Sequence, residues 1–262
     1  MRAHAAGWVV KVAALLALSA RPGAGQVPER FTNLRVFPKD TARKDLMREM
    51  RGWASALGVR CGHCHTGGNP ETLEVVDFAS DAKWAKRTAR SMLRMVRGVE
   101  GDYLHKLERR PTVTGTTVLR PPPLTCMTCH HGLTRPEALD AVLERSLRAE
   151  GAEAAVRTYK ELRTKYLDRG SYDFSERSVN TLAERLIQEK RSHDAVVLLE
   201  ASAEFNPNAA WQQHLLGEAL LAEGDRTRAR AAFARALALN PENDMTRKRL
   251  EELGGPAEGL PR

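Results

Sequence analysis

Cysteine and long apolar runs are scarce in this chain of 262 residues. Its four cysteines are too few for the disulfide-dense scaffold of a small secreted protein. After the first 25 residues no stretch approaches about 18 consecutive apolar residues, so we expect no membrane-spanning helix in the rest of the chain. Apolar residues nevertheless make up 42% and charged residues 28%, which excludes global disorder and allows one large domain or two of ordinary size.

Residues 1–25 have the pattern of a secretory signal peptide. Arg2 supplies a positive charge, and the largely apolar run 12–20 is nine residues long, too short to span a bilayer as a helix. The small residues Gly23, Ala24 and Gly25 favour cleavage before Gln26. An uncleaved N-terminal anchor is the alternative, and it would leave the protein associated with a membrane.

Positive charge is concentrated in the first half of the chain. Residues 26–136 contain 19 lysines and arginines against 11 aspartates and glutamates, a net +8, whereas residues 137–262 contain 19 against 22, a net −3. This charge favours an acidic partner or surface. We do not expect nucleic-acid binding, because the basic residues match no known nucleic-acid reader.

The second half contains a sequence repeat with a period of 34 residues, which is the tetratricopeptide (TPR) period. The better copy runs from Leu216-Gly217 to Pro241, and small residues within it would let paired helices approach closely. The pairs that are 34 residues apart are Ala195 and Ala229, Leu199 and Phe233, Ser202 and Ala236, Asn206 and Asn240, and Pro207 and Pro241.

The resemblance to TPR repeats covers residues 150–245. A helix expected over Ala154–Tyr166 would complete the stack, since about three repeats are needed for stability. The chain departs from the pattern at Gln213, where tryptophan is expected, and Trp211 lies two residues earlier. Such an array either binds a protein partner in its groove or packs as a scaffold against the first half. Generic helical hairpins are the other interpretation.

All four cysteines belong to two Cys-x-x-Cys-His strings, Cys61 to His65 and Cys126 to His130. This is the attachment string of c-type haem, with two thiols for the vinyl groups and a histidine under the iron. Zinc is less consistent, because 61 residues separate Cys64 from Cys126 and the histidines are unexplained. No βαβ pattern supports a redox dithiol. We expect two covalent haems, which would form much of the core of this domain and would account for an aromatic content of only 5%.

Two amphipathic helices are expected to supply the distal iron ligands. The first spans about 41–57, capped by Asp40 or Thr41 and ended by Gly58. The second spans about 81–97, with its apolar residues mostly inward. A distal methionine would close the iron for electron transfer, whereas an open site would permit peroxide chemistry. The methionines of these helices are Met47, Met50, Met92 and Met95, for which core packing is the other interpretation.

Residues 31–136 resemble one half of the tetrahaem cytochrome subunit of photosynthetic reaction centres, and resemble its shorter dihaem relatives more closely. The resemblance implies that Met50, which lies 11 residues before Cys61, ligates the first haem and that Met92 ligates the second. Met47, Met95 and His105 are the rival ligands. The matching stretches are 31–38, 50–65, 77–81, 92–97 and 126–136.

These patterns together predict a mainly α protein. A signal peptide (1–25) is followed by a small all-α dihaem cytochrome c domain (26–136) and an α-helical TPR domain (137–262). We expect a periplasmic electron carrier without enzymatic activity. Its redox partner would be a membrane-bound reaction centre, which would link the chain to photosynthesis, or a respiratory complex, with a protein partner bound in the TPR groove. A dihaem peroxidase and a redox-sensing or assembly protein are the alternatives.

Overall fold

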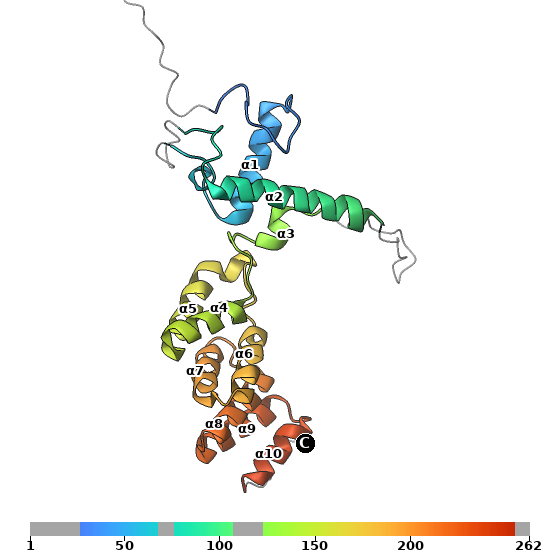
Figure 1. Cartoon of the computed structure of the whole chain (residues 1–262). Helices are drawn as coiled ribbons and strands as arrows, with labels where there is room; N and C mark the ends of the chain where they lie inside the picture. Colours follow the sequence, from blue (N-terminus) through green and yellow to red (C-terminus); the bar gives the residue numbers. More distant parts are fainter. Residues whose placement is uncertain (1–26, 68–75, 107–122, 255–262) are drawn as a thin grey trace, which may run out of the picture. The chain divides into compact units, whose positions relative to one another are not determined.

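The computed structural model describes residues 27–67, 76–106 and 123–254 (Figure 1). Within these ranges the chain forms ten α-helices and no strand, with one isolated antiparallel bridge between Thr66 and Asp77. The predicted mainly α fold class is therefore confirmed. The expected signal peptide (1–25) lies outside the described residues.

The chain divides into two compact units, each of which is described by itself. One unit comprises Met1–Arg48 and Arg60–Leu107, and the other comprises Glu49–Val59 and Glu108–Arg262. The boundary that the sequence predicts after residue 136 stays a prediction, because the turn after the second cysteine string bonds to residues on both sides of it within the second unit.

Helix α1 (Arg43–Leu57) begins two residues later than predicted. Thr41 does not cap it, because its hydroxyl donates back to the carbonyl of Pro38, 2.7 Å away. The helix ends at Gly58 as expected. Gly58 has φ +65°, and the next amide, of Val59, donates to the carbonyl of Ala54 at 2.9 Å, which closes the last turn.

Helix α2 (Trp84–Gly98) continues through one π-helical turn, η2 (Val99–Tyr103), into the short 3-10 turn η3 (Leu104–Lys106). Its buried residues are Ala85, Lys86 and Arg90. The prediction that its large apolar side chains face inward is wrong for three of them, because Trp84, Met92 and Met95 are exposed. The helix is amphipathic, but its charged side is the one that packs against the rest of the unit.

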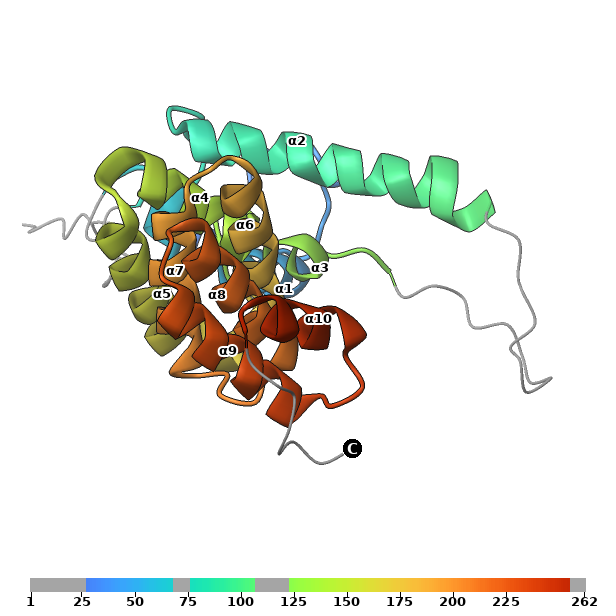
Figure 2. The same cartoon turned by 90° about the horizontal axis from the view of Figure 1, so that it is seen from below.

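The repeat part of the second unit is a series of antiparallel helix pairs that stack in chain order (Figure 1). Figure 2 shows the same pairs from the α10 end. Helix α5 confirms the helix predicted over Ala154–Tyr166. The pairs are α4 (Leu139–Glu150) with α5 (Ala152–Tyr166), α6 (Glu176–Gln188) with α7 (Ser192–Ala203), and α8 (Ala210–Ala222) with α9 (Arg226–Leu239), followed by α10 (Asp244–Glu252).

Small and large side chains interlock inside these pairs. A Cβ atom on Gly217 of α8 would come within 2.6–2.7 Å of three ring atoms of Phe233 on α9, so a hydrogen side chain is needed there. Helix α10 closes the stack through polar contacts with α8. Arg249 donates two hydrogen bonds to the carboxylate of Glu218, at 2.6 and 3.0 Å, and Thr246 bonds to buried His214 at 2.9 Å.

Candidate haem-attachment sites

The first cysteine string forms a single tight turn. Helix η1 (Cys61–His63) opens it, and the amides of Cys64 and His65 both donate to the carbonyl of Cys61, at 3.2 and 3.0 Å. Both thiols are half-buried and neither is in a disulfide. Two sulfur atoms and an imidazole are thereby gathered on about one turn of backbone, which is the arrangement that the spacing predicts.

His65 lies in an apolar and positively charged environment. Its ring packs against Phe78 with centroids 5.0 Å apart. Burial lowers the pKa of His65 to about 4, and the positive charge of Lys86 lowers it further, with partial opposition from the backbone of Phe78. The imidazole is therefore neutral at physiological pH, the form that binds a metal. Its Nδ1 atom is buried and has no hydrogen-bond partner of normal geometry within the described residues.

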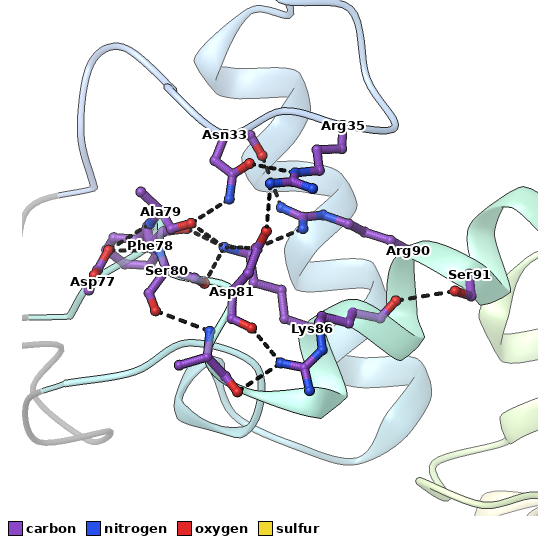
Figure 3. A network of polar contacts seen from close by, with 12 residues as sticks. Asn33, Arg35, Asp77, Phe78, Ala79, Ser80, Asp81, Lys86, Arg90 and Ser91 are labelled. Atoms are coloured by element: carbon purple, nitrogen blue, oxygen red, sulfur yellow. Dashed lines mark hydrogen bonds and ion pairs between the residues drawn. The ribbon is translucent and has the colours of Figure 1, made fainter.

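A network of cations surrounds the loop that carries Phe78 (Figure 3). The ammonium group of Lys86 donates to the carbonyls of Phe78, Ala79 and Ser80, at 2.8, 3.1 and 2.7 Å. Arg90 donates to the Asp81 carboxylate at 2.7 Å and to the carbonyl of Asn33 at 3.0 Å. Because every buried donor named here meets an acceptor, α2 can bury charge against this loop.

Asp81 is the carboxylate at the centre of this network. It pairs with Arg90 at 2.7 Å, with Arg35 at 3.3 Å and with Lys86 at 3.4 Å. A hydrogen bond from the Asn33 side chain is the main reason that the pKa of Asp81 is lowered to about 2, and the positive charge of Arg90 adds to it. Asp81 is thus ionised at neutral pH.

The second cysteine string forms its own short helix, α3 (Cys126–His130). Thr125 and Thr128 cap its start reciprocally, because each backbone amide donates to the other residue's hydroxyl, at 3.0 and 3.3 Å. His131 ends the helix in the left-handed conformation, with φ 45°. Cys126 and Cys129 are three residues apart on this helix and therefore share a face.

The imidazole of His130 is already oriented. Its Nδ1 atom lies 2.7 Å from the carbonyl oxygen of Leu133, so Nδ1 carries the hydrogen and donates. The other ring nitrogen, Nε2, is then the one with a lone pair available for a metal. An outer hydrogen bond of this kind fixes the tautomer and direction of metal-binding histidines.

The end of α1 packs backbone to backbone against the turn after α3. The amide of Gly132 donates to the carbonyl of Ala56 at 2.9 Å. Glu49 lies two turns before Ala56 on α1, and its negative charge acts on Cys126. Burial is the main reason that the pKa of the Cys126 thiol is raised, and the negative charge of Glu49 raises it further.

The candidate distal ligands are distributed over both units. Met47 and Met50 are half-buried on α1, Met92 and Met95 are 40% and 52% exposed on α2, and His105 is exposed in η3. Met50 belongs to the compact unit of the second string, and Met92, Met95 and His105 belong to that of the first. The predicted pairing of methionines with strings therefore stays a prediction.

Both strings fit covalently attached haem c. Each offers two unbridged thiols and a histidine on one turn, and the hydrogen bond of His130 leaves the required nitrogen for iron. In the described ranges no three histidine, cysteine, aspartate or glutamate side chains are grouped so as to hold a metal ion by themselves. None of the described helices is both long and apolar enough to cross a membrane.

Comparison with known families identifies the family of the chain. The pattern of the photosynthetic reaction centre cytochrome C subunit matches residues 17–166, which is more than half of the chain. The chain belongs to this family. It is therefore a cytochrome-type electron carrier that binds haem c. A tetratricopeptide repeat pattern matches residues 210–243, which span α8 and α9, and this confirms the better repeat copy predicted from the sequence. Repeats of this type mediate contacts between proteins. None of the curated proteins that were compared matches the chain.

The polar network around Asp81 was not found by the sequence analysis. Its members come from the segment 33–35, the loop 77–81 and α2. Two signals were present in the sequence. Lys86, Arg90 and Arg97 repeat at helical spacing on one side of α2, and the loop before this helix contains two aspartates.

Proposed function

We propose that the chain is a dihaem electron carrier of the periplasm whose repeats dock a protein partner. The observation that carries the proposal is the presence of two Cys-x-x-Cys-His turns, each with its own histidine. The positively charged first half favours a redox partner with an acidic surface. A membrane-bound reaction centre or a respiratory complex could be that partner, because both exchange electrons with cytochromes.

Each residue of the two sites has a separate role in this proposal. Cys61, Cys64, Cys126 and Cys129 would form the thioethers, and His65 and His130 would each bind an iron. Met50 for the first haem and Met92 for the second would each supply the other protein ligand to iron. Bound haem c supplies a reversible one-electron ferric–ferrous couple. A histidine and a methionine at each iron would keep it closed to substrates, and electron transfer needs no acid, base or nucleophile from the chain. We therefore propose that the chain is not an enzyme.

Two arguments support export to the periplasm. Residues 1–25 have the pattern of a signal peptide, and thioether-linked haem is assembled on the periplasmic side of the bacterial membrane. The intact mass of protein purified from the periplasm should match a chain that begins at Gln26 and carries its haems. A chain that still begins at Met1 and sediments with membranes would instead indicate an uncleaved anchor.

The haem count tests the proposal as a whole. Pyridine haemochrome spectra of the full chain, expressed with a cytochrome c maturation system, should report two haems per polypeptide. The double variant Cys126→Ala/Cys129→Ala should report one, and so should Cys61→Ala/Cys64→Ala. A haem-free chain would refute the proposal. A high-spin ferric signal with peroxide turnover would replace it with a dihaem peroxidase.

A further inference from the structure

We propose that Trp211 and Glu184 form a binding site for an arginine or lysine side chain of the protein that docks on the repeats. The inference names the chemistry of that partner and rests on the proposed docking function. It gives the chain two docking surfaces of different kinds. The positively charged first half suits an acidic redox partner, whereas the repeats take a cationic segment.

Trp211 is displaced from the place where a repeat of this type buries its tryptophan. The repeat pattern expects tryptophan at position 213, where this chain has Gln213. Two positions along an α-helix are separated by about 200° around its axis, so the tryptophan of this chain lies on another side of α8. There 39% of it is exposed. Its ring therefore presents aromatic surface to solvent.

The indole ring of Trp211 is held in one orientation. Its Nε1 atom donates a hydrogen bond of 2.9 Å to a carboxylate oxygen of Glu184 on the neighbouring helix α6. The ring also stacks on the imidazole of His214, with centroids 4.5 Å apart and planes 14° apart. His214 is itself buried and bonded to Thr246 at 2.9 Å. An aromatic ring that is already ordered binds a partner at little cost in conformational entropy.

Glu184 carries a negative charge that no cation neutralises within the part of the chain that the structure describes. Its side-chain partner there is the neutral indole, and no lysine, arginine or histidine lies within ion-pair distance of it. Burial lowers the pKa of His214, so this imidazole is uncharged at neutral pH. Carboxylates on the helices to either side do have cationic partners. The pairs are Arg185 with Asp140 and Glu144 of α4, at 3.8 and 3.1 Å, and Arg249 with Glu218 of α8, at 2.6 Å.

The ring and the carboxylate together suit a cation. A guanidinium or ammonium group is attracted to the face of a tryptophan ring when it lies within about 6 Å of the ring centre. Because Glu184 is bonded to the edge of the same ring, a cation on the ring also comes close to the carboxylate. An acidic side chain would be repelled by Glu184, and an apolar one would bury its charge without compensation. Arginine and lysine are therefore favoured over other side chains.

Isothermal titration calorimetry of the full-length dihaem protein at neutral pH and low ionic strength tests the inference. The probes are three short peptides, acetylated and amidated, in which glycine alternates with arginine, with glutamate or with leucine. The arginine peptide should bind more tightly than the other two. Glu184→Gln removes the charge but keeps an oxygen that accepts the indole hydrogen bond, and it should weaken binding of the arginine peptide about two- to fivefold. Trp211→Leu should weaken it about two- to thirtyfold.

Two matched controls separate this site from the rest of the surface. Glu200→Gln removes an exposed carboxylate of α7, and Trp84→Leu removes an exposed tryptophan of the first unit. Both variants should bind the arginine peptide as the wild type does. Circular dichroism should show the same helix content and melting midpoint for Glu184→Gln as for the wild type, so that its weaker binding reports the charge.

The other outcomes overturn the inference. Equal affinity of the arginine peptide for the wild type and Glu184→Gln would do so, as would binding of none of the peptides. A preference for the glutamate or leucine peptide that Trp211→Leu abolishes would leave docking on the repeats in place but exclude a cation. Self-association that Trp211→Leu abolishes, measured by light scattering, would make the occupant a second copy of the chain. In every case a haem count of two leaves the proposed electron carrier standing.

Discussion

Gly58 and Gly132 meet so closely that a Cβ atom on Gly58 would lie 2.2 Å from the carbonyl oxygen of Gly132. Gly58 ends α1 with φ +65°, and Gly132 follows the second attachment string with φ +85°. The contact joins the helix that carries Met50 to the turn that carries His130. Both residues have a left-handed backbone conformation, which favours glycine. At Gly58 a side chain would also collide with the carbonyl group of Gly132.

Gly58→Ala should therefore destabilise the protein. A left-handed alanine costs roughly 1–2 kcal/mol, and displacement of the Gly132 backbone adds to this. Thermal unfolding followed by circular dichroism should show a lower midpoint than wild type. Gly52→Ala is the control, because a Cβ atom there meets nothing within 4 Å. Equal midpoints for the two variants would contradict this account of the contact.

Gly217→Ala should weaken the repeat array specifically. The added methyl group would collide with the ring of Phe233, which is fully buried. Overpacking of this kind costs about 1–3 kcal/mol. Urea unfolding should show the loss, and the double variant Gly217→Ala/Phe233→Leu should recover part of it. The absorbance of the haem-bearing half should stay unchanged in the folded protein.

Acid should loosen the first unit through Asp81. Its pKa is about 2 in the folded protein against an ordinary 3.8, so its ionised form is favoured by folding. The stability that it contributes is fully present above about pH 4 and is lost as the pH falls toward 2. Asp81→Asn should lower stability at pH 7 and show a flatter stability profile between pH 4 and 2. Parallel profiles for both proteins would mean that another carboxylate is responsible.

Spectroscopy can test the proposed methionine ligands directly. Near-infrared magnetic circular dichroism of the ferric protein should show methionine–histidine ligation at both irons. Met50→Ala and Met92→Ala should each abolish one half of that signal. Met245→Ala, on α10 and 59% exposed, is the matched control and should leave it intact. If Met92→Ala leaves the near-infrared signal unchanged, the same measurement on Met95→Ala and His105→Ala should identify which of these residues is the ligand.

The sequence predicted what depends on short spacing. The two attachment strings, the helix ending at Gly58 and the repeat copy ending at Pro241 each rest on a few residues at fixed separations. The start of α1 was misplaced, because a threonine can cap a helix or, as Thr41 does, bond backwards to a turn. Spacing alone does not separate these choices.

The burial of Lys86 and Arg90 was beyond the reach of sequence periodicity. A helix pattern shows which residues share a side, but it does not show which side is covered. Here the charged side is buried, because carbonyls from residues 33 and 78–80 accept its hydrogen bonds. These acceptors are backbone atoms, which leave no mark in the composition. Because Met92 and Met95 are apolar, we expected their side chains to face inward, but both are exposed.

The uneven distribution of buried apolar side chains has a consequence for how the protein matures. Of the thirty buried apolar residues in the described ranges, only Leu46, Ala56, Ala85 and Leu133 precede residue 137. The repeats thus possess a complete interior made of their own side chains, whereas the cysteine-bearing half does not. We expect the carboxyl-terminal array to fold unaided. Haem would then be attached to a loosely ordered cysteine-bearing half that is already joined to a folded repeat array.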